Sequence, residues 1–341
     1  LRRSGSGDDT LRVSTADSID SIRFFGQGGD DRLFIGSNGD DLGRITAFGG
    51  SGLDTLAAGS AADTLDGGRR AGRLFGGAGD DDVFFDTADA AVIGGAGRDT
   101  LVGGSGADLV QLDQARFLFA GSHAAFEVVQ LGAGNDYFLG SSSAAAFSQY
   151  LGGGVSVFGG SGIDYISMRG NNAAVGINDF IDAGSGNDNI WAGNGNDTIY
   201  AGAGNDYTYG GFGNDTIFGR PGFDVDYVRR GEGHDTIVGT SGADRDGLVL
   251  FWGNDATLYD GVDPSEVSVQ YTGSNVIITF DSGGSVTFEK GAITTINLFD
   301  FANGDAGNGV SAPSKYSRDI WAADWDANSQ TFNAFTKVVD G

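Results

Sequence analysis

Apolar residues recur at a spacing of nine in the middle of the chain. Residues 183–218 form four consecutive units, AGSGNDNIW, AGNGNDTIY, AGAGNDYTY and GGFGNDTIF, and in three of them an isoleucine lies two places after an aspartate. Each aspartate follows a Gly-x-Gly-Asn segment. Glycine adopts the positive φ angles that tight turns need. Each unit therefore predicts one turn followed by one short strand whose apolar residue points inward.

Further units occur on both sides of this segment: GGSGLDTLA at 49–57, GGAGDDDVF at 76–84, GGAGRDTLV at 94–102, GGSGADLVQ at 103–111, GGSGIDYIS at 159–167 and RGEGHDTIV at 230–238. Aspartate supplies the hard oxygen ligand that Ca²⁺ prefers, and small glycines let backbone carbonyls crowd around a cation. These units resemble the repeats-in-toxin (RTX) family, whose units read GGxGxDxUx. The resemblance implies an all-β fold, a right-handed parallel β-roll with Ca²⁺ bound between its turns.

The nine-residue unit sets the geometry of the roll. One strand and one turn take nine residues, so a full coil takes eighteen, and turns on one edge stack about 4.8 Å apart. We expect each ion to lie between an aspartate and the aspartate one coil later. The expected pairs are Asp63 with Asp81, Asp81 with Asp99, Asp188 with Asp206, Asp197 with Asp215, Asp206 with Asp224 and, after a two-residue slip near 227–229, Asp215 with Asp235 and Asp224 with Asp244.

The candidate ligands fall into two groups. The aspartates are Asp31, Asp41, Asp54, Asp63, Asp81, Asp99, Asp108, Asp136, Asp164, Asp188, Asp197, Asp206, Asp215, Asp224, Asp235 and Asp244. The family resemblance adds backbone carbonyls of the glycine turns, here Gly184, Gly186, Gly193, Gly195, Gly202, Gly204, Gly211 and Gly213. One edge of the first half is expected to be largely free of metal, because the eighteen-residue count from Asp54 reaches Gly72, Ala90, Asp108 and Phe126.

The pattern divides the chain into five segments. Residues 1–48 form an irregular opening of the roll, with aspartates ten or eleven residues apart; 49–130 and 131–247 form two blocks of the β-roll. Within them, 112–130 and 140–158 lose the motif but keep apolar alternation. We interpret these two stretches as coils without calcium, in preference to insertions that bulge from the roll.

The composition changes after residue 248. Alternating strands with glycine- or asparagine-containing turns occupy 248–313, and we predict a small antiparallel β cap there. This segment resembles the haemolysin-type calcium-binding-related module that ends many RTX arrays, and a solenoid needs such a cap to cover its last coil. In residues 314–341, the spacing of Trp321, Trp325, Phe332 and Phe335 predicts an amphipathic helix.

The acidic charge of the chain predicts that folding needs calcium as a cofactor. Forty-six acidic residues against twenty basic ones give a formal charge of −26, and stacked aspartates repel one another without cations. About eight to ten Ca²⁺ ions, with six or more oxygen ligands each, would neutralise most of this charge. The acidic surface argues against nucleic-acid binding. The absence of cysteine excludes disulfides, and the absence of a long apolar stretch argues against membrane insertion.

Catalytic motifs are missing from the sequence. It has neither the HExxH of zinc proteases nor the G-x-S-x-G of lipases. His234 lies in a turn, and His123 has no recognisable partner. Arg69, Arg70 and Arg73 are interpreted as neutralising nearby aspartates in place of a missing Ca²⁺, with contact to a sugar carboxylate or lipopolysaccharide as the alternative. An outward row of aromatic residues suits sugar stacking, self-association or plain cross-strand stacking: Trp191, Tyr200, Tyr207, Tyr209 and Phe218.

These observations predict a secreted, non-enzymatic protein that folds on extracellular Ca²⁺. We expect a structural or adhesive role at the cell surface, in a surface layer, filament or matrix, with self-association or cell-surface polysaccharide as partners. The resemblance implies type I export from a Gram-negative bacterium, with a signal within 314–341. The alternative is the C-terminal calcium module of a larger secreted toxin or polysaccharide-active enzyme, and a chain that starts at Leu1 without Met is compatible with this alternative.

Overall fold

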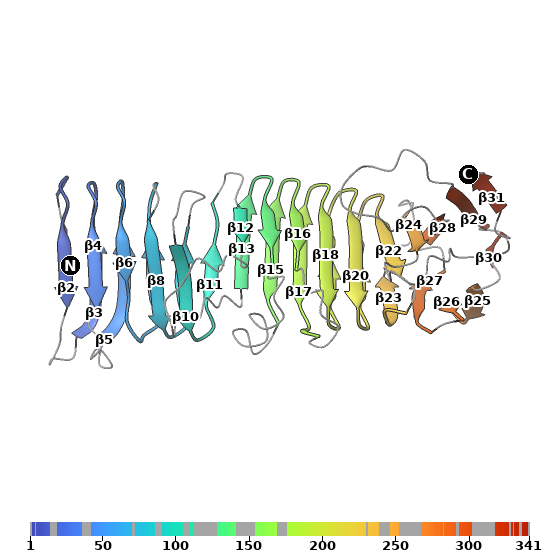
Figure 1. The fold of residues 1–341 in the computed structure, drawn as a ribbon, viewed down its shortest axis with the longest axis horizontal. Coiled ribbons are helices and arrows are strands. Elements are labelled where there is room, and N and C mark those ends of the chain that lie inside the picture. The colour runs from blue at the N-terminus through green and yellow to red at the C-terminus, as the bar shows by residue number, and fades with distance from the viewer. Residues whose placement is uncertain are drawn as a thin grey trace, which may run out of the picture. The chain divides into compact units, whose positions relative to one another are not determined.

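The computed structural model describes residues 2–3, 5–13, 19–35, 42–69, 72–85, 91–104, 109–111, 128–140, 154–168, 176–229, 231–238, 246–251, 267–281, 283–290, 293–301, 318–326, 329, 331–333 and 336–339. In this described part every regular element is a β-strand (Figure 1). The chain divides into two units, Leu1–Tyr165 and Ile166–Gly341.

The strands of the first unit are β1 (Arg2–Arg3), β2 (Thr10–Val13), β3 (Ile19–Phe25), β4 (Arg32–Ile35), β5 (Leu42–Phe48), β6 (Thr55–Ala57), β7 (Thr64–Asp66), β8 (Arg73–Ala78), β9 (Asp82–Phe84), β10 (Ala91–Ala96), β11 (Thr100–Val102), β12 (Leu109–Gln111), β13 (Val128–Ala133), β14 (Tyr137–Leu139) and β15 (Ser156–Ser161). Strand β16 (Tyr165–Ser167) spans the boundary between the units.

Consecutive strands of the first unit alternate between sheets. One sheet has the order β1-β3-β5-β7-β9-β11-β13-β15, the second has the order β10-β8-β6-β4-β2, and β12 pairs with β14. The described strand pairings in this unit are parallel, for example β5 with β7 and β6 with β8. Each strand therefore lies beside the strand one coil away, which is the architecture of a parallel β-solenoid consistent with a β-roll.

The second unit repeats this arrangement and then changes. Its strands are β17 (Phe180–Ser185), β18 (Asn189–Asn194), β19 (Thr198–Tyr200), β20 (Tyr207–Phe212), β21 (Thr216–Phe218), β22 (Val225–Arg229), β23 (His234–Val238), β24 (Asp246–Phe251), β25 (Val267–Thr272), β26 (Asn275–Phe280), β27 (Ser285–Glu289), β28 (Ile293–Phe301), β29 (Arg318–Asp326), β30 (Thr331–Phe332) and β31 (Thr336–Val339). The parallel series are β17-β19-β21-β23-β27 and β18-β20-β22-β24-β28.

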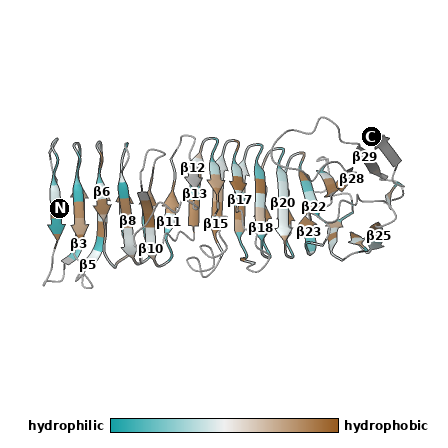
Figure 2. Ribbon diagram, viewed as in Figure 1, coloured by the Kyte–Doolittle hydropathy of each residue, from teal (hydrophilic) through white to brown (hydrophobic). Residues whose placement is uncertain are grey.

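The core consists of columns of buried apolar side chains from successive coils, and Figure 2 shows hydrophobic positions along the stacked strands. In the first unit one column is Phe24, Ala47, Leu65, Val83, Leu101, Val129 and Val157, and each of these residues is at most 4% exposed. In the second unit a column of isoleucines runs through Ile181, Ile199, Ile217 and Ile237. These are the residues two places after an aspartate, as the repeat predicts.

Coil length varies although the register is kept. The aspartate pairs are 22 and 23 residues apart at the start of the first unit and 18 apart from Asp63 to Asp99. Near the end of this unit, Val110 pairs with Phe138 and Val129 with Val157, so a coil there takes 28 residues. Residues 128–130 and 156–158 lie in strands, as the alternation predicts. The other parts of 112–130 and 140–158 lie mostly outside the described residues, so whether they continue the roll or bulge from it stays a prediction.

An antiparallel cap closes the C-terminal end of the second unit. Strand β27 pairs in parallel with β23 on one side and antiparallel with β26 on the other. Strand β28 likewise pairs in parallel with β24 and antiparallel with β29. The fold class predicted from the sequence, an all-β parallel β-roll with a small antiparallel cap, is confirmed.

The helix predicted for the C-terminal tail is wrong. Residues 318–326 form β29, which pairs along its length with β28, and β31 adds to its other side. The spacing of aromatic residues misled the prediction, because pairing with the strand edge of β28 satisfies the backbone of this segment and overrides a local helical period.

Candidate calcium-binding ladders

The predicted ligand aspartates within the described residues form hydrogen-bonded ladders along the turns, and Asp9, Asp179 and Asp246, which were not predicted as ligands, join them. In each step, the main-chain N–H of one aspartate donates to Oδ1 of the aspartate one coil later, at 2.8 Å for Asp188 to Asp206 and for Asp197 to Asp215. The other steps are Asp9 to Asp31, Asp31 to Asp54, Asp63 to Asp81, Asp81 to Asp99, Asp136 to Asp164, Asp179 to Asp197, Asp206 to Asp224, Asp215 to Asp235 and Asp224 to Asp246.

The second carboxylate oxygen of several of these aspartates is buried without a hydrogen bond from the described part of the chain. This holds for Oδ2 of Asp31, Asp54, Asp81, Asp197, Asp206, Asp215 and Asp224, and each of these residues is at most 1% exposed. A buried oxygen without a partner is costly, and native proteins almost always satisfy such atoms. The loops therefore present hard oxygen atoms that require a cation.

Glycines open the space into which these oxygens point. A Cβ atom built on Gly76 would lie 2.4 Å from Oδ2 of Asp81 and 2.5 Å from the carbonyl oxygen of Gly94. The same oxygens converge at Gly26, where a Cβ would be 2.3 Å from both Oδ2 of Asp31 and the Gly49 carbonyl. Three loops of the second unit have alanine at this position instead: Ala183, Ala192 and Ala201. Carboxylate and carbonyl oxygens are the ligand set that Ca²⁺ takes.

The glycines predicted to supply carbonyls all adopt left-handed backbone conformations. Gly193 and Gly195 have φ angles of 107° and 146°, and the other six lie between 101° and 145°. Their stacking leaves no room for side chains, since a Cβ on Gly211 would lie 1.9 Å from the Gly193 carbonyl oxygen. Within the described residues no three Asp, Glu, His or Cys side chains gather around one point. Main-chain carbonyls must therefore supply much of each coordination shell.

Burial raises the pKa of the ladder carboxyls in the absence of a cation. Desolvation is the largest cause for Asp197, Asp215 and Asp224, whose pKa rises to about 8, and neighbouring ladder carboxylates add to it. In the first unit the same cause raises the pKa of Asp81 to about 7. A bound cation would favour the charged form instead.

A second ladder runs beside the first in the opposite direction, and sequence analysis missed it. Where the residue just before a ligand aspartate is asparagine or aspartate, its side-chain Oδ1 accepts the main-chain N–H of the corresponding residue one coil later. The second unit uses asparagine: Asn178 accepts from Asn196, Asn187 from Asn205, Asn196 from Asn214, Asn205 from Phe223 and Asn214 from His234. The first unit uses Asp8, Asp30, Asp80 and Asn135. The recurring GND triplet is its sequence signal.

One predicted pair is wrong. Opposite Asp224 the register places Asp246, not Asp244, because Val225 pairs with Gly247 and the coil takes 22 residues. The spacing alone gave a slip of two residues, which holds for Asp215 and Asp235 but not for this coil. Asp41, Asp108 and Asp244 lie outside the described residues, so their assignment as ligands stays a prediction.

The ladders end where apolar residues replace aspartate. In one ladder of the first unit, Ile45 takes the position one coil before Asp63, and its main-chain N–H donates to Oδ1 of Asp63. On the other edge, Arg73 pairs with Thr55, which places Gly72 opposite Asp54 as the spacing predicts. At the cap, Val286 pairs with Asp235 and Ile293 with Asp246.

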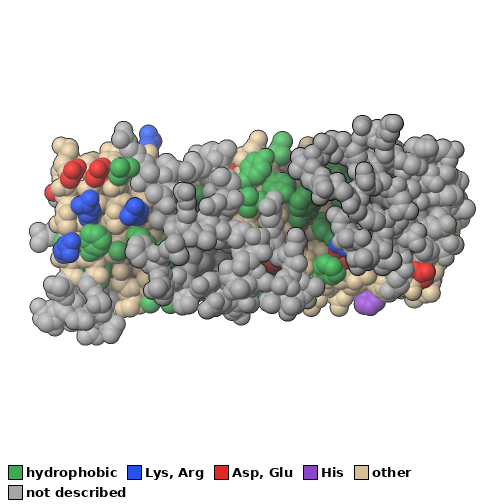
Figure 3. Space-filling model, viewed as in Figure 1, with side chains coloured by type: hydrophobic (Ala, Val, Ile, Leu, Met, Phe, Trp, Pro, Cys, Tyr) green, Lys and Arg blue, Asp and Glu red, His purple; other side chains and the backbone are tan. Residues whose placement is uncertain are grey.

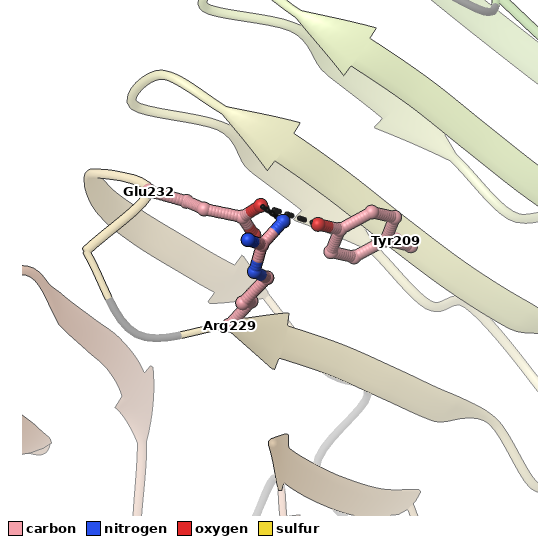
Figure 4. Close-up of polar contacts among 3 residues, drawn as sticks. All are labelled: Tyr209, Arg229 and Glu232. Carbon is pink, nitrogen blue, oxygen red and sulfur yellow. Dashed lines mark hydrogen bonds and ion pairs between the residues drawn. The ribbon is translucent and has the colours of Figure 1, made fainter. Parts of the chain in front are cut away.

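Two polar clusters of the second unit lie outside this register. Figure 4 shows Glu232 accepting hydrogen bonds from the Tyr209 hydroxyl and from Nη1 of Arg229, the latter at 3.1 Å. Burial raises the pKa of Glu232 to about 7. In the core, Thr208 donates its hydroxyl to Asp226, and both side chains occupy the column of Ile190. The polar atoms of both clusters hydrogen-bond to other side chains of the protein. We therefore assign both clusters a role in stabilising the fold.

The predicted aromatic row is partly a cross-strand stack. The rings of Tyr200 and Phe218 lie 4.5 Å apart at an angle of 9°, which turns their faces toward each other rather than toward a ligand. Trp191 and Tyr207 are 46% and 45% exposed. His234 contacts Ser285 through Nδ1 at 2.9 Å, while His123 lies outside the described residues.

The comparison with protein families agrees with this geometry. The RTX calcium-binding nonapeptide repeat (four copies) matches residues 46–69, 73–89, 91–113, 175–208, 209–226 and 230–245. No curated protein matches the chain. Among the described residues no helix is long and apolar enough to cross a membrane. The chain thus carries calcium-binding nonapeptide repeats of the RTX family in both of its units.

Proposed function

We propose that this protein is a secreted, non-catalytic RTX protein that folds on extracellular Ca²⁺ and serves a structural or adhesive role at the cell surface. The observation that carries the proposal is the set of buried aspartate Oδ2 atoms that receive no hydrogen bond from the described part of the chain; those of Asp31, Asp54 and Asp81 lie at turns where a glycine carbonyl converges with them. RTX repeats are typical of secreted proteins.

Calcium supplies what the chain lacks for folding. The formal charge is −26, and about eight to ten divalent ions would cancel most of it. Ordering so many glycines costs conformational entropy. In the low Ca²⁺ of a cytosol the repeats are therefore expected to be unfolded. Extracellular modules of this kind have dissociation constants of about 10⁻⁴–10⁻³ M, which matches millimolar Ca²⁺ outside the cell.

The hydrogen bonds of the carboxylates support a structural role. The described carboxylates of the turns belong to the two ladders, and the other buried ones hydrogen-bond to Tyr209, Arg229 or Thr208. The described strands stack into extended parallel sheets. Such surfaces suit lateral contact with polymers or other chains.

The test is light scattering coupled to size exclusion, from excess chelator to about 10 mM Ca²⁺, with circular dichroism on the same samples. The proposal expects an expanded chain in chelator and ordered, larger species in calcium. A compact monomer at every calcium concentration above the folding midpoint would favour the alternative, a calcium module of a larger secreted toxin or enzyme. An unchanged size and spectrum would overturn calcium-driven folding itself.

A further inference from the structure

Arginine side chains gather on one outer face of the first unit. The face belongs to the sheet of β2, β4, β6 and β8, and Figure 3 shows basic and hydrophobic side chains over it, with acidic ones at the turn edge. The register aligns Thr10, Arg32, Thr55 and Arg73 in one row and Arg12, Phe34, Ala57 and Phe75 in the next. We name Arg12, Arg32 and Arg73, together with Phe34 and Phe75 on the same strands as Arg32 and Arg73, the arginine strip.

These arginines do not neutralise the ladder. All three are exposed, and the ion pairs of the described residues are Arg220 with Asp182 and Arg229 with Glu232, both in the second unit. Arg12 lies over the ring of Phe34, 5.1 Å from its centroid. The nearest ladder carboxylates, those of Asp31 and Asp54, are buried in the turns. The role expected from the sequence for Arg73, charge neutralisation, is not seen.

We propose that the arginine strip binds an acidic polysaccharide, and this rests on the adhesive role proposed above. A guanidinium group offers a planar fork of donors that fits carboxylate and sulfate groups bidentately. Thr10 and Thr55 in the same row add hydroxyl groups that hydrogen-bond to sugars. Charge complementarity selects a polyanion. Nucleic acid is disfavoured, because the chain carries a formal charge of −26.

The layout also sets the direction of the polymer. Arg32 and Arg73 are two coils apart, about 9.6 Å, while the two rows are separated along the strands by about 6.6 Å. The exposed carboxylates of Asp8 and Asp30 lie at the turns that precede β2 and β4. A polyanion that runs across the strands contacts all three arginines and avoids this acidic edge.

The experiment compares dextran sulfate and polygalacturonate with neutral dextran, with the full chain in calcium. The test variant is R12Q/R32Q/R73Q. The control is R23Q/R44Q/R98Q, which removes three exposed arginines elsewhere in the same unit. Circular dichroism and size exclusion without polymer confirm that each protein folds on calcium as the unsubstituted chain does.

We expect binding to one or both acidic polymers and none to dextran. The test variant is expected to weaken binding by at least about tenfold and the control by less than about twofold. The polymer that binds identifies the group, sulfate or carboxylate. Equal binding by both variants would mean that calcium bridges the polymer to carboxylates, and it would overturn the proposal. Self-association lost only in the test variant would assign the strip to a second copy of the chain instead. If calcium does not drive folding but the polymer still binds through the strip, this result contradicts the proposed function and supports the arginine strip as a binding surface.

Discussion

The main-chain N–H of Asp197 donates a 2.8 Å hydrogen bond to Oδ1 of Asp215, eighteen residues later, while Oδ2 of Asp215 is buried without such a bond. The Asp215 carboxylate therefore has two roles. Its Oδ1 fixes the register of neighbouring coils, and its Oδ2 remains as a ligand for a cation. Substitutions at the ladder therefore separate these two roles.

Asp206→Asn keeps the acceptor for the N–H of Asp188 and removes the charge. Asp206 lies between Asp188 and Asp224, so two adjacent sites lose a ligand oxygen. The calcium midpoint of folding, followed by circular dichroism, is expected to rise by about tenfold or more, ~1.4 kcal/mol per decade. The control is Asp182→Asn, which removes the same charge from the face of β17, outside the turns. An equal shift in both variants would mean that net charge alone matters.

The fold without metal is expected to be most stable in acid. The pKa of Asp197, Asp215 and Asp224 is about 8 in the metal-free fold, against an ordinary value of 3.8. Folding therefore takes up protons between these values. Stability without calcium is fully present below about pH 4 and is lost as the pH rises toward 8. Thermal unfolding in chelator across this range measures it, and a rise in stability with pH contradicts the burial of these carboxyls.

Calcium-driven folding is expected to release few protons, because the unfolded chain from which it starts already has ionised aspartates at neutral pH. The calcium midpoint of folding is therefore expected to change by less than about twofold between pH 6 and 8. A calcium titration at three pH values in this range gives the slope. A midpoint that falls by roughly tenfold per pH unit would show that the ions bind a preformed fold whose carboxyls are protonated.

Substitution of Asn196 tests the second ladder. Its Oδ1 accepts the N–H of Asn214 at 2.7 Å. Asn196→Ala removes this acceptor and is expected to lower the stability of the calcium-loaded fold by about 0.5–1.5 kcal/mol. Asn196→Asp keeps the acceptor, so it is expected to retain the stability that Asn196→Ala loses. Urea unfolding of both variants in saturating calcium measures the difference.

Gln27 has a φ angle of 72° at a turn position where other loops have glycine. Left-handed backbone costs a residue with a Cβ roughly 1–2 kcal/mol. Gln27→Gly is therefore expected to raise the free energy of unfolding by about 0.5–1 kcal/mol, after the entropy cost of glycine. The matched control is Gly50→Ala, whose Cβ would lie 2.5 Å from the Gln27 carbonyl oxygen and which should destabilise the protein. A destabilised Gln27→Gly variant would show that the glutamine side chain has a role that outweighs the strain.

The period of nine predicted the strands, the inward residues and most of the aspartate pairs, because each depends on local spacing. Asp246 was missed because the length of one coil depends on how β24 pairs with β22, which no local pattern reports. The helix prediction for the tail was wrong for a related reason: β29 forms because it pairs with the edge of β28. The arginine strip was missed because Arg12, Arg32 and Arg73 meet only after the coils are stacked.

The 28-residue coils keep Val129 beside Val157 although each contains ten residues more than a regular coil. Pairing resumes in the same phase after the added residues, so the position of the next turn does not depend on them. A coil of this solenoid can therefore accept an inserted peptide. Insertion can change the surface chemistry of the repeat while the aspartate ladder keeps its register.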